Sequence, residues 1–96
     1  MLEKELQAKC LLYLKTIKAW SVKTIASNRA GVPDILACIN GKFIAFELKR
    51  KGENVTPLQA YNGREIRTAG GEWFMIDDYE KFKQIINSIK GVSNVN

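Results

Sequence analysis

Residues 31–49 read G-V-P-D-I-L-A-C-I-N-G-K-F-I-A-F-E-L-K, and this stretch decides the fold. Two apolar runs flank Asn40-Gly41, a pair typical of a two-residue hairpin turn. If these two residues form the turn, residues whose numbers sum to 81 lie opposite one another, and Asp34 faces Glu47. Directly opposed residues share a face of the sheet, and the period of two adds Lys49 to that face.

Two carboxylates and a lysine are therefore expected at the open end of a mostly apolar hairpin. Burying like charges together is costly unless a proton or a cation compensates them. We take Asp34, Glu47 and Lys49 as the candidate active site.

The composition favours one small domain with a polyanionic partner. The 96 residues carry a net charge of +5 and contain no histidine. Such a balance suggests nucleic acid before membrane, although solvated lysines give the same charge. Arg29, Arg50, Lys51 and Lys23 are the candidate DNA contacts, and the run at 49–51 is either a phosphate contact or a solvated strand end.

Both cysteines, Cys10 and Cys38, lie in apolar patterns and are expected to be reduced core residues. The N-terminus lacks a signal-peptide pattern, and no apolar run approaches the length of a membrane span. We therefore expect a soluble, cytoplasmic protein.

The remaining elements are read from periodicity and helix caps. Helices are expected over residues 2–18, from Pro57 to about Ala69, and from Asp77 or Asp78 to Gly91, with strands over 19–25 and 72–76. The order is α-β-β-β-α-β-α, which indicates an α/β fold with a mixed sheet flanked by helices. A single domain is expected over residues 1–91, with a frayed tail at 92–96.

Two polar residues outside the hairpin have competing explanations. Glu3 lies on the core-facing stripe of the first helix, where it either joins the site or favours the helix dipole. Gln59 lies at the third position of a helix that Thr56 is expected to cap, and a capping box is a sufficient reason for it.

The chemistry open to this set is limited. Without histidine, His-based acid–base catalysis and imidazole metal sites are excluded, and no phosphate-binding glycine loop of the P-loop or dinucleotide type is present. Carboxylate and main-chain oxygens suit Mg²⁺ or Mn²⁺, which acidifies a bound water, and Lys49 can stabilise charge on a phosphate. This combination indicates hydrolysis of phosphodiester bonds in nucleic acid.

The motifs P-D at 33–34 and E-L-K at 47–49, with twelve residues between them, resemble those of the PD-(D/E)XK nucleases. The longer motifs G-V-P-D at 31–34 and F-E-L-K at 46–49, with T-P-L-Q at 56–59 and an N-terminal M-L-E helix, resemble the VRR-NUC branch, the virus-type replication-repair nucleases. The resemblance covers about residues 2–80. It implies a restriction-endonuclease-like α-β-β-β-α-β core with a C-terminal helix.

The resemblance also implies roles for individual residues. Asp34, Glu47 and the Leu48 carbonyl would ligate the metal, and Lys49 would be the catalytic lysine. Gln59 would be the motif glutamine, and Glu3 the helix-1 acid, with Glu5 as the fallback. It further implies a stand-alone domain of phage or bacterial type, a homodimer that cuts branched DNA such as Holliday junctions.

Overall fold

The computed structural model describes residues 1–90, and its element order is the predicted one. The elements are α1 (Glu3–Thr16), β1 (Trp20–Lys23), β2 (Ile35–Ile39), β3 (Lys42–Leu48), α2 (Pro57–Thr68), β4 (Glu72–Ile76) and α3 (Tyr79–Ile89). The expected domain end at Gly91 and the tail at 92–96 lie outside the described residues. No helix within residues 1–90 is long and apolar enough to cross a membrane.

The four strands form one mixed sheet in the order β1-β2-β3-β4. β2 is antiparallel to β1 and β3, whereas β4 joins β3 in parallel, as predicted. Asn40 and Gly41 both have positive φ (52° and 81°), which a tight primed turn requires. Ile39 pairs with Lys42 and Ile35 with Phe46, so the predicted register is confirmed.

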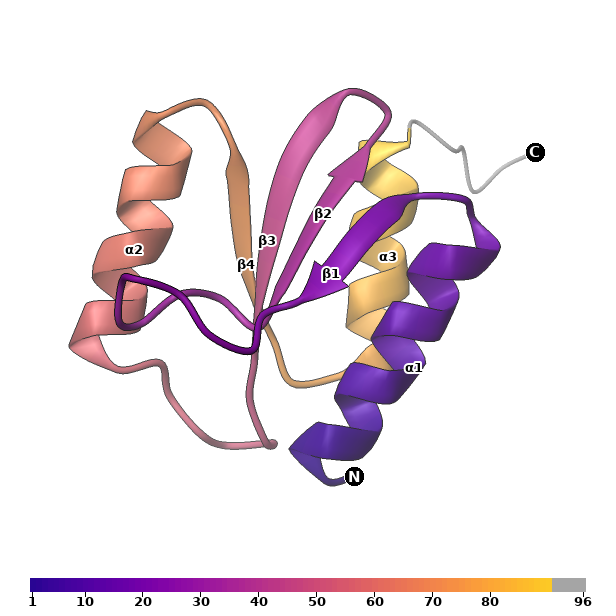
Figure 1. Ribbon diagram of the computed structural model, residues 1–96. Helices are drawn as coiled ribbons and strands as arrows, with labels where there is room; N and C mark the ends of the chain where they lie inside the picture. Colours follow the sequence, from indigo (N-terminus) through magenta and orange to yellow (C-terminus); the bar gives the residue numbers. More distant parts are fainter. Residues whose placement is uncertain (91–96) are drawn as a thin grey trace.

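Helices cover both faces of the sheet, with α1 and α3 on one side and α2 on the other (Figure 1). The core lies on the α1/α3 side, where the Phe46 and Phe82 rings meet edge to face, 4.9 Å apart. Its other fully buried members include Cys10, Leu14, Ile35, Ile44, Leu48, Ile76 and Ile86. This packing covers the face of the hairpin that lies opposite to α2.

On the opposite face, α2 packs on β3 and β4. Gly63 allows this approach, because a side chain at that position would overlap the Trp73 ring. α2 begins with the predicted capping box: the Thr56 hydroxyl accepts from the Gln59 amide (3.2 Å), and the Gln59 side chain accepts from the Thr56 amide (2.9 Å). Asp78 caps α3 through the Glu80 amide.

One expectation about the core is wrong. Cys10 is buried, but Cys38 is exposed on the face of the sheet that α2 covers only in part. Trp20 and Val22 of β1 lie on the same face and are also exposed, because no helix within residues 1–90 packs over this corner. Trp20 and Val22 of β1 and Cys38 of β2 are therefore surface residues, whereas Leu36 between them is half-buried.

Candidate active site

The hairpin register sets Asp34 against Glu47, one step beyond the Ile35–Phe46 pair. Both side chains lie on the α2 face, and Glu47 forms a hydrogen bond with the Asp34 side chain. The predicted hairpin register, which sets Asp34 opposite Glu47, is therefore present in the structure. The two-residue turn is its cause, since a shift by one residue would turn one carboxylate to the other face.

Asp34 is fixed by hydrogen bonds on both sides. Its Oδ2 accepts from the Leu48 amide at 2.8 Å, and its carbonyl accepts from the Thr24 amide at 2.9 Å. The Thr24 hydroxyl also donates to the Pro33 carbonyl at 2.8 Å. One carboxylate oxygen of Asp34 is thus tied to β3, which orients the other.

Glu47 is almost fully buried, with 2% of its surface exposed. Burial, the hydrogen bond to Asp34 and the charge of Asp34 raise its pKa to about 8, although the Lys49 charge opposes the rise. Its Oε1 is buried without a hydrogen-bond partner among residues 1–90. A buried carboxylate with a free oxygen is costly and calls for a cation or a proton.

Lys49 and Glu3 are the nearest additional charges. Both are half-buried, and the Lys49 amide donates to the Ile76 carbonyl, which extends the β3–β4 ladder past Leu48. The pKa of Glu3 is raised by burial first and by the Asp34 charge second. Glu5 is exposed instead, and its side chain accepts from the Leu2 amide. Glu3 is therefore the acid of α1 on whose pKa the charge of Asp34 acts.

The carboxylate pair can be compared with the needs of the metal that the sequence implies. Within residues 1–90, no group of three or more Asp, Glu, His or Cys side chains is close enough together to hold an ion. Asp34 and Glu47 nevertheless offer free oxygens, including the orphaned Oε1. Mg²⁺ and Mn²⁺ are held by one or two carboxylates and keep several waters, so the pair fits such an ion. The Leu48 carbonyl as a further ligand stays a prediction.

Gln59 is half-buried at the start of α2, and its side-chain oxygen is engaged in the capping box. The structural explanation of this residue is therefore present. Its role in the site stays a prediction.

The predicted basic contacts are exposed, and two of them form ion pairs. Arg29 pairs with Glu65 (3.2 Å), and Lys51 pairs with Asp78 (3.3 Å). Arg50 and Lys23 extend into solvent beside the hairpin, at the ends of β3 and β1. Exposed ion pairs such as these are weak, so both cations remain accessible to phosphate.

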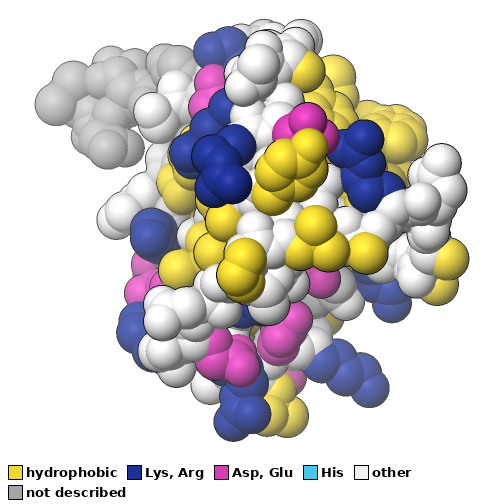
Figure 2. Space-filling model, turned by 90° about the vertical axis from the view of Figure 1, so that its left-hand side faces the viewer, with side chains coloured by type: hydrophobic (Ala, Val, Ile, Leu, Met, Phe, Trp, Pro, Cys, Tyr) yellow, Lys and Arg dark blue, Asp and Glu magenta, His cyan; other side chains and the backbone are white. Residues whose placement is uncertain are grey.

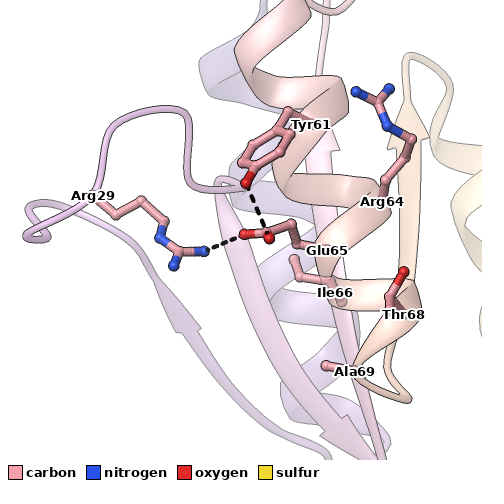
Figure 3. A pocket seen from close by; sticks show the side chains of 7 residues that line it. All are labelled: Arg29, Tyr61, Arg64, Glu65, Ile66, Thr68 and Ala69. Atoms are coloured by element: carbon pink, nitrogen blue, oxygen red, sulfur yellow. Dashed lines mark hydrogen bonds and ion pairs between the residues drawn. The ribbon is translucent and has the colours of Figure 1, made fainter.

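A hollow of about 560 Å³ lies elsewhere, between α2 and the loop that precedes Asp34. Figure 3 shows the Arg29 guanidinium and the Tyr61 hydroxyl both directed at the Glu65 carboxylate. Neither Asp34 nor Glu47 lines this hollow. Since the groups in it satisfy one another, we place the site at the carboxylate pair.

Sequence reasoning missed Asn62, which is 3% exposed within α2. Its side-chain amide donates to the Ala30 carbonyl (3.0 Å) and the Leu58 carbonyl (3.1 Å), and its oxygen lies 3.4 Å from Arg29 Nη1. These bonds attach the loop before Asp34 to α2. The available signal was Asn62-Gly63, two poor helix formers that stand together inside a helix and need a packing reason.

Comparison with known proteins places the fold. Neither a protein-family model nor a curated protein sequence matches the chain. Among solved structures, it is similar to a VRR_NUC domain, with a TM-score of 0.79 and 20% sequence identity over 88% of this chain and 94% of that one. The two chains share a fold, and the predicted α/β class with a helix-flanked mixed sheet is confirmed.

Proposed function

We propose that this chain is a metal-dependent nuclease of the VRR-NUC type that hydrolyses phosphodiester bonds in DNA. The observation that carries the proposal is the buried Glu47 carboxylate, with its orphaned oxygen, beside Asp34. A stably folded protein gains little from two adjacent acids at this depth unless they bind something positive. The fold shared with a VRR_NUC domain supports the same conclusion.

In this proposal Asp34, Glu47 and the Leu48 carbonyl would hold Mg²⁺ or Mn²⁺, and Glu3 would be the further acid of the metal site. A divalent cation bound there supplies positive charge that polarises the phosphodiester and acidifies a water molecule. Lys49 would orient the attacking water and stabilise the negative charge that develops on the phosphate. Gln59 adds a polar side chain at the start of α2.

We further propose that the substrate is branched DNA, such as a four-way junction, and that the enzyme acts as a homodimer in the cytoplasm of a bacterial or phage-infected cell. Two active sites are needed to cut two strands, and one domain of this size offers limited surface to grip a junction. Arg29, Arg50, Lys51 and Lys23 supply the phosphate contacts. Sedimentation of the protein with and without junction DNA tests the dimer, and a monomer at micromolar concentration in both cases would contradict it.

The direct test is cleavage of a labelled four-way junction with Mg²⁺ or Mn²⁺. We expect wild type to cut and Asp34→Asn to be inactive, although the side-chain oxygen of the asparagine can still accept from the Leu48 amide. Glu72→Gln is the matched control, since it removes a half-buried carboxylate at the start of β4, whereas Glu47 lies beside the end of that strand. Equal cleavage by wild type and Asp34→Asn would refute the proposal.

A non-catalytic DNA-binding module and a nuclease for other DNA or RNA substrates are the alternatives. The same assay separates them when it includes linear duplex, single-stranded DNA and RNA. Salt-dependent binding without cleavage of any substrate would favour the binding module.

A further inference from the structure

The sheet face that carries the carboxylates has three rows of side chains. The first row holds Thr24, Asp34 and Glu47; the second holds Val22, Leu36 and Ala45; and the third holds Trp20, Cys38 and Phe43. Each row runs across β1, β2 and β3 in register. We call Trp20, Cys38 and Phe43 the aromatic row.

The aromatic row is open to solvent. Trp20 is 63% exposed and Phe43 45%, and Cys38 between them is also exposed. α2 packs on β3 and β4 and leaves this corner uncovered. The small Cys38 side chain lies in register between the two aromatic residues, and the Phe43 ring lies beside Gly71, just before β4.

Positive charge gathers at the same end of the sheet. The ends of α1, α2 and α3 all lie there (Figure 1), and among the described residues Lys18 follows α1, Arg67 lies in the last turn of α2 and Lys90 follows α3. Lys18 and Lys90 line one hollow together with Cys38. Figure 2 shows apolar, basic and acidic side chains interspersed on the α2 side of the molecule.

Exposed aromatic rings among lysines and arginines are suited to unpaired nucleotides. Bases stack on the rings, and the cations attract the phosphates. A duplex cannot use such a surface fully, since its bases already stack on one another. A protein partner would gain from the rings but not from this excess of positive charge.

The row also lies at a useful distance from the carboxylates. Asp34 and Cys38 are four residues apart on β2, about 13 Å at 3.3 Å per residue. At 3.4 Å per stacked nucleotide this corresponds to about four nucleotides. We propose that the aromatic row binds unpaired bases of a strand whose scissile phosphate lies at Asp34 and Glu47, an inference that rests on the proposed nuclease function.

The proposal is tested by binding without any metal, so that cleavage plays no part. The probes are labelled eight-nucleotide oligo-dT, oligo-U and a blunt duplex of equal length, followed by fluorescence anisotropy. We expect tighter binding of single strands than of duplex, and a loss of affinity of roughly 5- to 150-fold for Trp20→Leu and for Phe43→Leu. The dT and U arms show whether DNA or RNA is preferred.

Two variants serve as controls. Leu12→Ala alters a side chain that is also 63% exposed but lies on α1, away from this face, and is expected to bind as wild type. Trp20→Tyr keeps an aromatic ring and is expected to retain most of the affinity. A third variant, Trp73→Phe, provides a direct signal, because it leaves Trp20 as the sole tryptophan. Binding of oligo-dT should quench the fluorescence of Trp20.

The outcomes separate this inference from the function on which it rests. Unchanged oligonucleotide affinity in Trp20→Leu and Phe43→Leu overturns the inference even if junctions are cut. A change only in sedimentation, with affinity intact, also overturns it and assigns the row to contact between copies. Binding that depends on the row in a protein that cuts nothing supports the binding of unpaired bases by the row, but refutes the nuclease and the placement of a scissile phosphate at the carboxylates.

Discussion

Replacing Glu47 by Gln is expected to stabilise the metal-free protein while it removes activity. Gln has nearly the same shape, carries no charge and can donate to Asp34. The folded protein holds the pKa of Glu47 near 8, against 4.5 for the unfolded chain. Because the folded pKa is the higher one, the folded state favours the proton, and its stability falls as pH rises from 4.5 towards 8.

The size of the effect follows from these two values. Each pH unit in this window costs about 1.4 kcal/mol, and the full difference amounts to roughly 4–5 kcal/mol. Water entering the open end of the hairpin reduces that figure, so we expect Glu47→Gln to exceed wild type by about 2–4 kcal/mol at pH 8. Below pH 4.5 the two proteins should be equally stable.

The assay is urea unfolding of both proteins from pH 4.5 to 9 in the presence of a chelator. Glu72→Gln is the control for loss of one carboxylate and should follow wild type. Added Mg²⁺ at pH 8 should stabilise wild type far more than Glu47→Gln, since a ligand of the folded state stabilises it. A Glu47→Gln protein that is less stable than wild type at pH 8, or parallel to it at every pH, would refute the reasoning.

Three further substitutions test neighbouring residues. Lys49→Ala should lower junction cleavage by roughly 10²–10³-fold, the usual cost of losing one donor that stabilises charge in the transition state. Its Mg²⁺ affinity, measured by calorimetry, should be retained. A near-normal cleavage rate would remove Lys49 from catalysis. Gln59→Glu keeps the capping box and should leave the melting temperature unchanged, but cleavage should fall by about tenfold or more; full activity would leave Gln59 with its capping role alone. Asn62→Ala should cost about 1–3 kcal/mol in urea unfolding, because the Ala30 carbonyl loses its donor; an unchanged midpoint would show that the loop is held by other contacts.

The fold was accessible from sequence wherever local chemistry and tertiary packing agree. Asn40-Gly41 dictates a turn with positive φ at both residues, and the register follows from it without further information. Thr56-Pro57 and Gly70-Gly71 bound α2 within a residue of its observed ends. In each case a backbone requirement is met by the few residue types able to satisfy it.

The remainder depended on which surfaces meet, and single-strand patterns do not carry that information. Cys38 lies in an apolar strand, yet it is exposed because α2 stops short of β1 and β2. Asn62 is a polar residue that helical patterns assign to the solvent side, yet it is buried because the loop before Asp34 packs against it. Glu3 approaches Asp34 only because α1 crosses the open end of the hairpin, whereas Glu5 turns away to cap the helix.

The two-residue turn has a consequence for how the protein can change. Each residue added on one side of Asn40-Gly41 must be matched by one on the other side for Asp34 and Glu47 to remain opposed. The number of residues between the two acids must therefore stay even. The types of these intervening residues can vary, as long as the core remains packed. A sequence search that accepts any even spacing between these acids, and rejects odd ones, would follow the parity that the hairpin imposes.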